Sequence, residues 1–214
     1  MLQIDVKKTI LLVVVICLHN AFAYAKNSVW LEKLDSILAV SENIVAEKNN
    51  KIAMLKQMAA KETNTSLLLK RYWELSEEYY VFKFDSAKIY VEKGLALARK
   101  TNNRRYVVAN SIMLAKLLAI GGLYSEAISN LSKINPEILE PDLFFDYHIA
   151  YFTIYSYWAD YCNDNTYSPI YKEKSNACLK KAVDYIDKNS EAYDYYMGEY
   201  HVYVDKDDNK ALKH

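Results

Sequence analysis

Residues 117–128 read Leu117-Leu118-Ala119-Ile120-Gly121-Gly122-Leu123-Tyr124-Ser125-Glu126-Ala127-Ile128. The first four residues end a long apolar segment, and the Gly-Gly pair that follows is typical of a helix C-terminus. The segment from Tyr124 onward has the pattern of the start of a second helix. This stretch therefore predicts a helical hairpin, and weaker copies of its pattern elsewhere predict a series of stacked helix pairs.

The positions around this turn fit a repeated helical hairpin of the tetratricopeptide (TPR) kind, which has a period of about 34 residues. Ala115 and Ala127 are small, as expected where two helices approach closely, and Tyr124 is expected to fill the wedge behind the turn. In the preceding hairpin, Phe84 and Ala87 stand where Tyr124 and Ala127 stand here. The residues that match the pattern are Leu114, Ala115, Leu118, Tyr124, Ala127, Leu131 and Pro136. We therefore predict an all-α, TPR-like helical-hairpin solenoid.

Composition agrees with this fold class and excludes some functions. The 214 residues are 52% hydrophobic and include only 4 Gly and 3 Pro, too few for the many turns of an all-β protein. Lys plus Arg and Asp plus Glu are both 27, so charge gives no reason to expect direct nucleic acid binding. The 20 Tyr residues suit half-buried surfaces and grooves, where the ring is covered and the hydroxyl stays solvated.

The N-terminal residues have the order of a secretory signal. Lys7 and Lys8 precede an apolar run over residues 9–18, and small residues follow at Ala21, Ala23 and Ala25. We expect residues 1–25 to be a signal peptide cleaved after Ala23 or Ala25, which predicts a periplasmic protein. The alternative is an uncleaved segment that anchors the chain in the inner membrane, the one way in which we expect it to contact a membrane.

Three further segments follow. Residues 26–62 predict an amphipathic helix or a pair of helices with a break at Asn49-Asn50, residues 63–204 the helical repeats, and residues 205–214 an incomplete repeat or tail. Within the repeats, the apolar periodicity and turn residues predict helices over residues 67–82, 84–100, 104–120, 123–133, 142–163, about 168–188, and 190–204.

The sequence contains no pattern typical of a catalytic, cofactor or metal site. His148 and His201 have no further His or Cys at ligand spacing, so we predict no metal and no cofactor. Cys162 and Cys178 fall too far apart along the predicted helix pair for a disulfide, and we interpret both as buried small apolar residues. We therefore predict that the protein is not an enzyme.

Aromatic residues are the candidate binding residues. Tyr147, Tyr151, Tyr155 and Trp158 repeat every three or four residues along one helix, and Tyr196 and Tyr200 belong to a similar series on a later helix. These rings have two interpretations. They pack one repeat against the next, or they line the concave side of the solenoid and bind a ligand.

Several short motifs carry a family resemblance: Leu34-Asp35-Ser36-Ile37, Lys51-Ile52-x-x-Leu55-Lys56, Phe84-Asp85-Ser86-Ala87, and Asp160-Tyr161-Cys162-Asn163 followed by Tyr167-Ser168-Pro169-x-Tyr171. Together, over most of residues 30–204, they resemble the exported TPR-like sensor region of membrane regulators in Bacteroides-type bacteria, which carry a C-terminal domain of unknown function. The resemblance implies further repeats, a membrane-spanning helix and a cytoplasmic output region in full members. Because the printed sequence has none of these, we expect a truncated member or a shortened relative.

These observations lead to a functional hypothesis with two alternatives. We expect a non-catalytic scaffold that binds a protein or peptide, and in a longer relative this binding would bias a transmembrane signal. The alternative is a carbohydrate-binding scaffold in which Tyr and Trp rings stack on sugars. An open last repeat at residues 205–214 also predicts self-association, because terminal repeats normally need a capping helix.

Overall fold

The computed structural model describes residues 6–214 of the protein, with side chains from Val29 onward. The chain divides into two compact units, Met1–Ala53 and Met54–His214, and each is described by itself. The expected signal cleavage at Ala23 and Ala25 lies outside the residues whose side chains are described. Within the described residues, no helix combines the length and apolarity needed to cross a membrane.

Helix α1 runs without interruption from Val6 to Lys61 and supplies all the secondary structure described in the first unit. Of the two alternatives for residues 26–62, the structure therefore has the single helix, without the break at Asn49-Asn50. Asn is a weaker helix former than Ala or Lys but does not block the helix as Pro does, and the neighbouring Ala, Glu and Lys residues favour helix.

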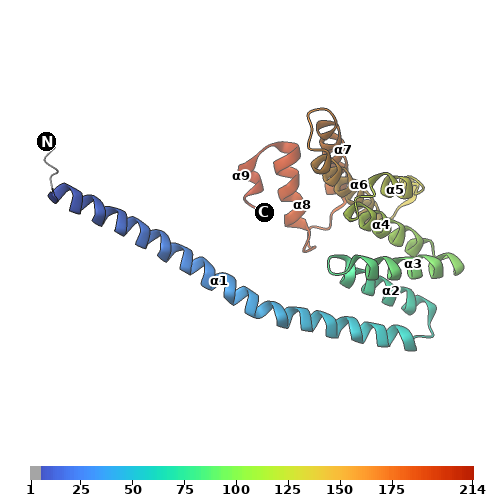
Figure 1. Cartoon of the computed structure of the whole chain (residues 1–214). Helices are drawn as coiled ribbons and strands as arrows, with labels where there is room; N and C mark the ends of the chain where they lie inside the picture. The colour runs from blue at the N-terminus through green and yellow to red at the C-terminus, as the bar shows by residue number, and fades with distance from the viewer. Residues whose placement is uncertain (1–5) are drawn as a thin grey trace. The chain divides into compact units, whose positions relative to one another are not determined.

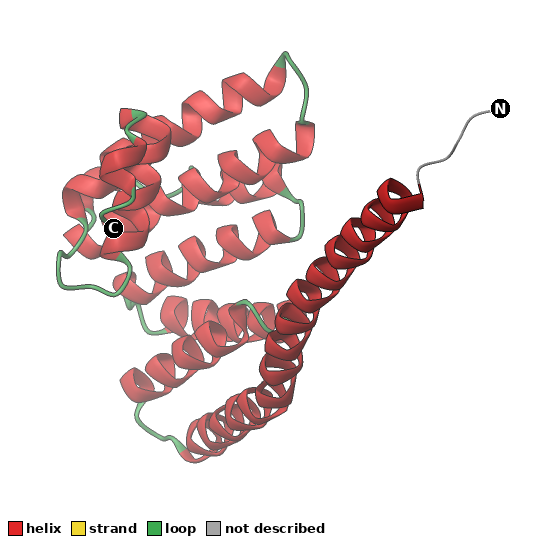
Figure 2. Ribbon diagram, turned by 90° about the vertical axis from the view of Figure 1, so that its left-hand side faces the viewer, coloured by secondary structure: helices red, strands yellow, loops and turns green. Residues whose placement is uncertain are grey.

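The second unit is built from helical hairpins joined by short loops, and Figure 2 shows no strand in the described part of the chain. Its helices are α2 (Thr65–Tyr80), α3 (Phe84–Lys100), α4 (Arg104–Ile120), α5 (Tyr124–Leu131), α6 (Pro141–Cys162), α7 (Tyr167–Ala182), α8 (Tyr193–Tyr200) and α9 (Asp208–Ala211). Two 3₁₀ turns, η1 (Pro136–Ile138) and η2 (Val183–Tyr185), and a π-helical segment, η3 (His201–Asp205), complete the unit. The all-α prediction is confirmed.

The helix ends have identifiable local causes. Asn64 caps α2 by accepting hydrogen bonds from the backbone N–H groups of Ser66 and Leu67. The hairpin loops use residues that tolerate a left-handed backbone, namely Asn102 (φ 53°), Gly122 (φ 77°) and Asn163 (φ 43°). The predicted bounds of α3 and α4 are confirmed, and those of α2, α5 and α6 are right to within two residues.

The helices of the second unit stack as α2/α3, α4/α5 and α6/α7 pairs, in chain order (Figure 1). The buried residues of α3 recur every three or four positions, so one stripe of the helix faces its neighbours: Ala87, Val91, Gly94, Leu95 and Ala98. A second core joins α4, α5 and α6 through Ala115, Ala127, Leu131 and Ala150, which are fully buried. Small residues in this core allow close helix packing.

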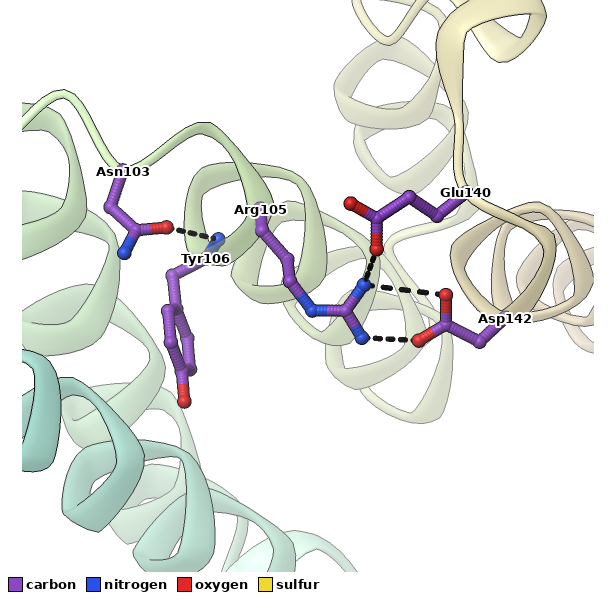
Figure 3. Close-up of polar contacts among 5 residues, drawn as sticks. All are labelled: Asn103, Arg105, Tyr106, Glu140 and Asp142. Atoms are coloured by element: carbon purple, nitrogen blue, oxygen red, sulfur yellow. Dashed lines mark hydrogen bonds and ion pairs between the residues drawn. The ribbon is translucent and has the colours of Figure 1, made fainter.

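Arg105 ties the start of α4 to the start of α6 (Figure 3). Its guanidinium contacts the carboxylates of Glu140 and Asp142, with a second contact of 3.3 Å from Nη1 to Asp142 Oδ1. The Arg105 hydrogen bond lowers the pKa of Asp142 below its ordinary value. The contact links the first helices of two successive hairpins at their exposed ends.

The C-terminal helix differs from its prediction. A single helix was expected over residues 190–204, but α8 spans only Tyr193–Tyr200 and continues as the π-helical η3. Lys206 ends this segment with a left-handed backbone (φ 55°), and the Asp207 N–H donates to the His201 carbonyl. Lys206 and Asp207 therefore separate η3 from α9.

Candidate binding groove

A groove of about 540 Å³ lies where α6, α7 and the α8–η3 segment meet. Its floor is formed by Phe152 of α6 and Ser175 of α7, which are both buried. Its walls carry tyrosine rings, hydroxyls and charged groups, including Thr153, Ser156, Tyr157, Asp160, Lys172, Asn176, Tyr195, Tyr196, Glu199 and Tyr203. A hollow of this size, part apolar and part polar, has the properties of a ligand site.

Four tyrosines give the groove its chemical character. Tyr157, Tyr195 and Tyr203 are 44%, 61% and 51% exposed, so their rings are open to a ligand. Tyr196 lies deeper, where its ring packs edge-on against Phe145 at 5.4 Å and against Tyr195 at 4.9 Å. Exposed tyrosines beside a buried aromatic floor are typical of protein and peptide binding surfaces.

Hydrogen bonds hold the groove walls in place. Ser156 Oγ and Ser175 Oγ lie 2.6 Å apart and join α6 to α7. Ser175 Oγ also donates to the Phe152 carbonyl at 3.0 Å. Across the groove, Asn176 Nδ2 donates to the Tyr203 carbonyl at 3.0 Å, which fixes η3 against α7. The walls are therefore preorganised by contacts between elements.

Two carboxylates, Asp160 and Glu199, line the groove, and within the described residues neither has an ion-pair partner within 4.0 Å. Burial raises the pKa of Glu199. Burial, followed by the nearby Glu199 charge, also raises the pKa of the Tyr195 phenol, so this hydroxyl stays protonated as a hydrogen-bond donor. Lys172 is the one lysine or arginine among the lining residues.

A group of ionisable residues on α2, α4 and α6 lies close to the groove tyrosines Tyr157 and Tyr196. Tyr80, Lys116 and Asp146 of this group are half-buried, and Glu77 is exposed. Lys116 of α4 places Nζ 5.4 Å from the centre of the Tyr80 ring. Burial lowers the pKa of Lys116, while Asp146 and Glu77 oppose the shift. Burial raises the pKa of Asp146, which the Lys116 charge partly offsets. Burial also raises the pKa of Tyr80, to about 12.

The tyrosines of α6 that were predicted to bind a ligand lie on a different face of the helix from the residues that line the groove. Tyr147 is only 7% exposed and belongs to the core shared with α4 and α5, against which Tyr151 also packs. Tyr151 stacks on Tyr155 at 5.9 Å, and Tyr155 stacks on Tyr171 of α7 at 6.1 Å. These rings form an aromatic ladder between helices, and none of them lines the groove.

Trp158 completes this ladder. Its indole stacks with Tyr171 of α7 at 4.3 Å and with Tyr124 of α5 at 5.5 Å. From the later helix, Tyr196 lines the groove, whereas Tyr200 packs against the core around Ile149. Of the six aromatic residues predicted to bind a ligand, Tyr196 is therefore the one placed in the groove.

The predicted repeat-packing residues lie at helix contacts. Ala87, Ala115 and Ala127 are fully buried, and Phe84 lies against Gly121 of the next hairpin loop. Leu114 is half-buried and borders a shallow hollow beside α5.

The cysteines do not pair with each other, and the rings of His201 and His214 stack at 5.4 Å. Cys162 and Cys178 are unpaired thiols, as predicted, but both are half-buried and not fully buried. Burial raises the pKa of the Cys178 thiol to about 11. His148 is buried with Nδ1 unpartnered, and burial lowers its pKa. Within the described residues, His, Cys, Asp and Glu side chains make no group of three or more suited to a metal ion.

Sequence reasoning missed most of the groove residues. Thr153, Tyr157 and Asp160 are spaced by three or four positions on α6, so they share a face that is polar as well as aromatic. The more aromatic series from Tyr147 to Trp158 is the one that the sequence pattern predicted to bind a ligand. Because a wholly aromatic stripe normally packs inside a protein, the mixed stripe was the better signal for an open site.

The comparisons with known proteins give one match. A family model described as the SusR N-terminal TPR domain matches residues 38–214. Neither the search of curated proteins nor the search of solved structures returned a match. The matched range includes every residue that lines the groove.

Proposed function

The chain belongs to the family of SusR N-terminal TPR domains, and from this premise we propose that it is a non-catalytic scaffold that binds a protein or peptide. The observation that carries the proposal is the groove between α6, α7 and α8–η3, which presents three exposed tyrosines over a buried floor. TPR repeats stack into extended surfaces that hold partners, and tyrosine is enriched where such partners bind.

The proposal extends to a signalling role. The basic and apolar pattern of residues 7–25 supports export to the periplasm, and the family match supports a sensor region of a Bacteroides-type regulator. In this role, a partner bound in the groove would favour one arrangement of the helical pairs. A ligand shifts such an equilibrium only by its difference in affinity for the two arrangements.

A peptide bound in the groove is favoured over a sugar stacked on the aromatic ladder of α6. The rings of Tyr155 and Trp158 already stack against Tyr171 and are therefore not free to cover a sugar face. The open rings are Tyr157, Tyr195 and Tyr203, which line a hollow of about 540 Å³.

Peptide selection followed by mutation tests the proposal. A random peptide library is selected on the purified chain, and the selected peptide is titrated by calorimetry. We expect Tyr157→Ala and Tyr195→Ala each to weaken binding about tenfold, as truncation of a central interface aromatic does. Tyr161→Ala is the matched control, because Tyr161 lies on the same helix as Tyr157 and is 78% exposed but does not line the groove.

The outcomes separate the alternatives. Binding weakened about tenfold in each of the two groove variants, with the Tyr161→Ala affinity unchanged, supports the proposal. Equal affinity in all three variants shows that the peptide binds elsewhere and contradicts it. Selective binding to a glycan array, abolished by Tyr157→Ala while no peptide is selected, would replace the peptide with a carbohydrate.

A further inference from the structure

We propose that a cationic hollow formed by the α3–α4 turn and the α5–η1 connection binds an acidic segment of a partner protein. The hollow measures about 430 Å³. Its lining includes the cations Arg99, Arg104 and Lys133 and the apolar residues Val108, Ile134 and Leu139. None of these residues lines the tyrosine groove, so the inference is independent of the function proposed there.

Three cations surround the hollow and no carboxylate does. Arg99 lies in the last turn of α3, Arg104 begins α4, and Lys133 follows α5. All three are exposed, and within the described residues none has a carboxylate within 4.0 Å. Because the chain as a whole is neutral, this is a local concentration of positive charge that favours an anionic ligand.

Arg104 and Arg105 are adjacent in the sequence but differ in their partners. Arg105 forms ion pairs with Glu140 and Asp142, as Figure 3 shows, so its positive charge is already paired within the protein. Arg104 precedes it by one residue, lines the hollow and has no such partner. Since consecutive helix residues lie on different faces, only Arg104 is available to a ligand on this side.

The rest of the lining favours a peptide over a bare anion. Asn130 donates Nδ2 to the Ser111 carbonyl at 2.7 Å, which ties α5 to α4 at the base of the hollow. Val108, Ile134 and Leu139 are half-buried and pack on the core beneath it. A segment that alternates acidic and aliphatic side chains would satisfy both the cations and this apolar base, whereas inorganic phosphate would use only the cations.

The test measures fluorescence anisotropy with the full chain and three identically labelled probes. They are a short peptide in which Glu alternates with Leu, the same peptide with Gln in place of Glu, and single-stranded DNA. Inorganic phosphate serves as an unlabelled competitor. We expect the Glu peptide to bind at least about tenfold tighter than the Gln peptide, since charge-assisted contacts are the stronger ones, and to lose affinity as salt increases.

Variants locate the site. Arg104→Gln and Lys133→Gln are each expected to weaken the Glu peptide about tenfold. Lys180→Gln removes the same charge from an exposed position on α7 and is expected to leave the affinity unchanged. Because all three side chains are exposed, the variants should fold, and thermal melting checks this. The tyrosine variants Tyr157→Ala and Tyr195→Ala should bind the Glu peptide normally, which separates this site from the groove.

Three results would overturn the inference. The Glu and Gln peptides bind equally, Arg104→Gln and Lys133→Gln both bind as the unmodified chain does, or DNA or inorganic phosphate binds tighter than the Glu peptide. The last result would identify a phosphate-bearing ligand in place of an acidic protein segment. If a variant melts early, charge reversal at Lys133 (Lys133→Glu) must still abolish binding to the Glu peptide for the inference to stand.

Discussion

At the scale of single residues, Gly94 sets how closely α3 approaches α4. A Cβ atom at Gly94 would lie 2.6 Å from Asn110 Oδ1, closer than real Cβ contacts allow. Asn110 is fully buried, and its Nδ2 donates to the Tyr106 carbonyl at 2.7 Å, so its side chain has little room to move. Oδ1 of Asn110 has no hydrogen-bond partner.

We expect Gly94→Ala to lower the free energy of unfolding by about 1–3 kcal/mol, the usual cost of overpacking a core. An exposed helix glycine changed to Ala would instead gain about 1 kcal/mol. Chemical denaturation measures the difference. The double variant Gly94→Ala/Asn110→Ala removes the clash and should recover most of the loss, so additive effects of the two changes would contradict this account.

The sequence allowed the buried alanines to be predicted but not this contact. Ala115 and Ala127 follow from a repeat pattern that many proteins share. The Gly94–Asn110 contact depends on the distance between two helices, which no periodicity specifies. A polar residue within a long helix appears in the sequence only as an interruption, and its buried position follows from tertiary packing.

At the scale of elements, the α4–α5 loop illustrates how neighbouring glycines differ. Gly121 has φ −76°, which any residue adopts, whereas Gly122 has φ 77° with no atom within 4 Å of an added Cβ. We expect Gly122→Ala to lower the free energy of unfolding by about 1–2 kcal/mol, because an L side chain disfavours the left-handed backbone. Gly121→Ala is the control.

The Gly121→Ala variant should change stability much less, because its Cβ would meet Phe84 only at ordinary contact distance, 3.4 Å. Thermal melting of the two single variants checks this expectation. Equal losses would contradict the expectation that the left-handed backbone makes Gly122 the more sensitive of the two positions.

Helix ends were predictable where a turn residue marks them. The α3 and α4 bounds follow from Thr101-Asn102-Asn103 and from the glycine pair, which are local signals. The interruption at His201–Asp205 was not predictable, because residues 190–204 contain neither Gly nor Pro after Gly198. The π-helical segment is held by long-range contacts such as Asn176 to Tyr203, which sequence periodicity does not record.

At the scale of the whole molecule, His148 couples protonation to unfolding. Burial holds its pKa below the ordinary value of 6.5, so the unfolded chain binds this proton more readily than the folded chain. The free energy of unfolding should therefore fall as pH decreases below about 6.5 and level off below the folded pKa. Above about pH 7 this contribution is constant.

We expect His148→Phe to reduce the loss of melting temperature between about pH 7.5 and pH 5.5, because the replacement keeps a ring beside Phe144 and Tyr147 but removes the titrating group. Differential scanning calorimetry at several pH values measures the effect. Parallel pH profiles for the two proteins would show that His148 does not contribute to this dependence.

The groove itself forms only where the third hairpin meets the C-terminal segment. Its lining residues come from α6, α7 and α8–η3, and the irregular end of α8 determines where Tyr203 lies. Tyr196 was found from the sequence because it belongs to a regular series. Tyr157, Tyr195 and Glu199 were not, since their shared position depends on how the third hairpin meets the following helix.

The ring stacking around Trp158 has a practical consequence. Its indole touches Tyr124 of α5, in the preceding hairpin, and Tyr171 of α7, the partner helix of its own hairpin, so its light emission depends on both helices staying packed against α6. Replacing the other tryptophans, Trp30 and Trp73, by Phe would leave Trp158 as the sole indole. The protein would then carry an intrinsic optical probe of whether its middle repeats stay together or separate when a partner arrives.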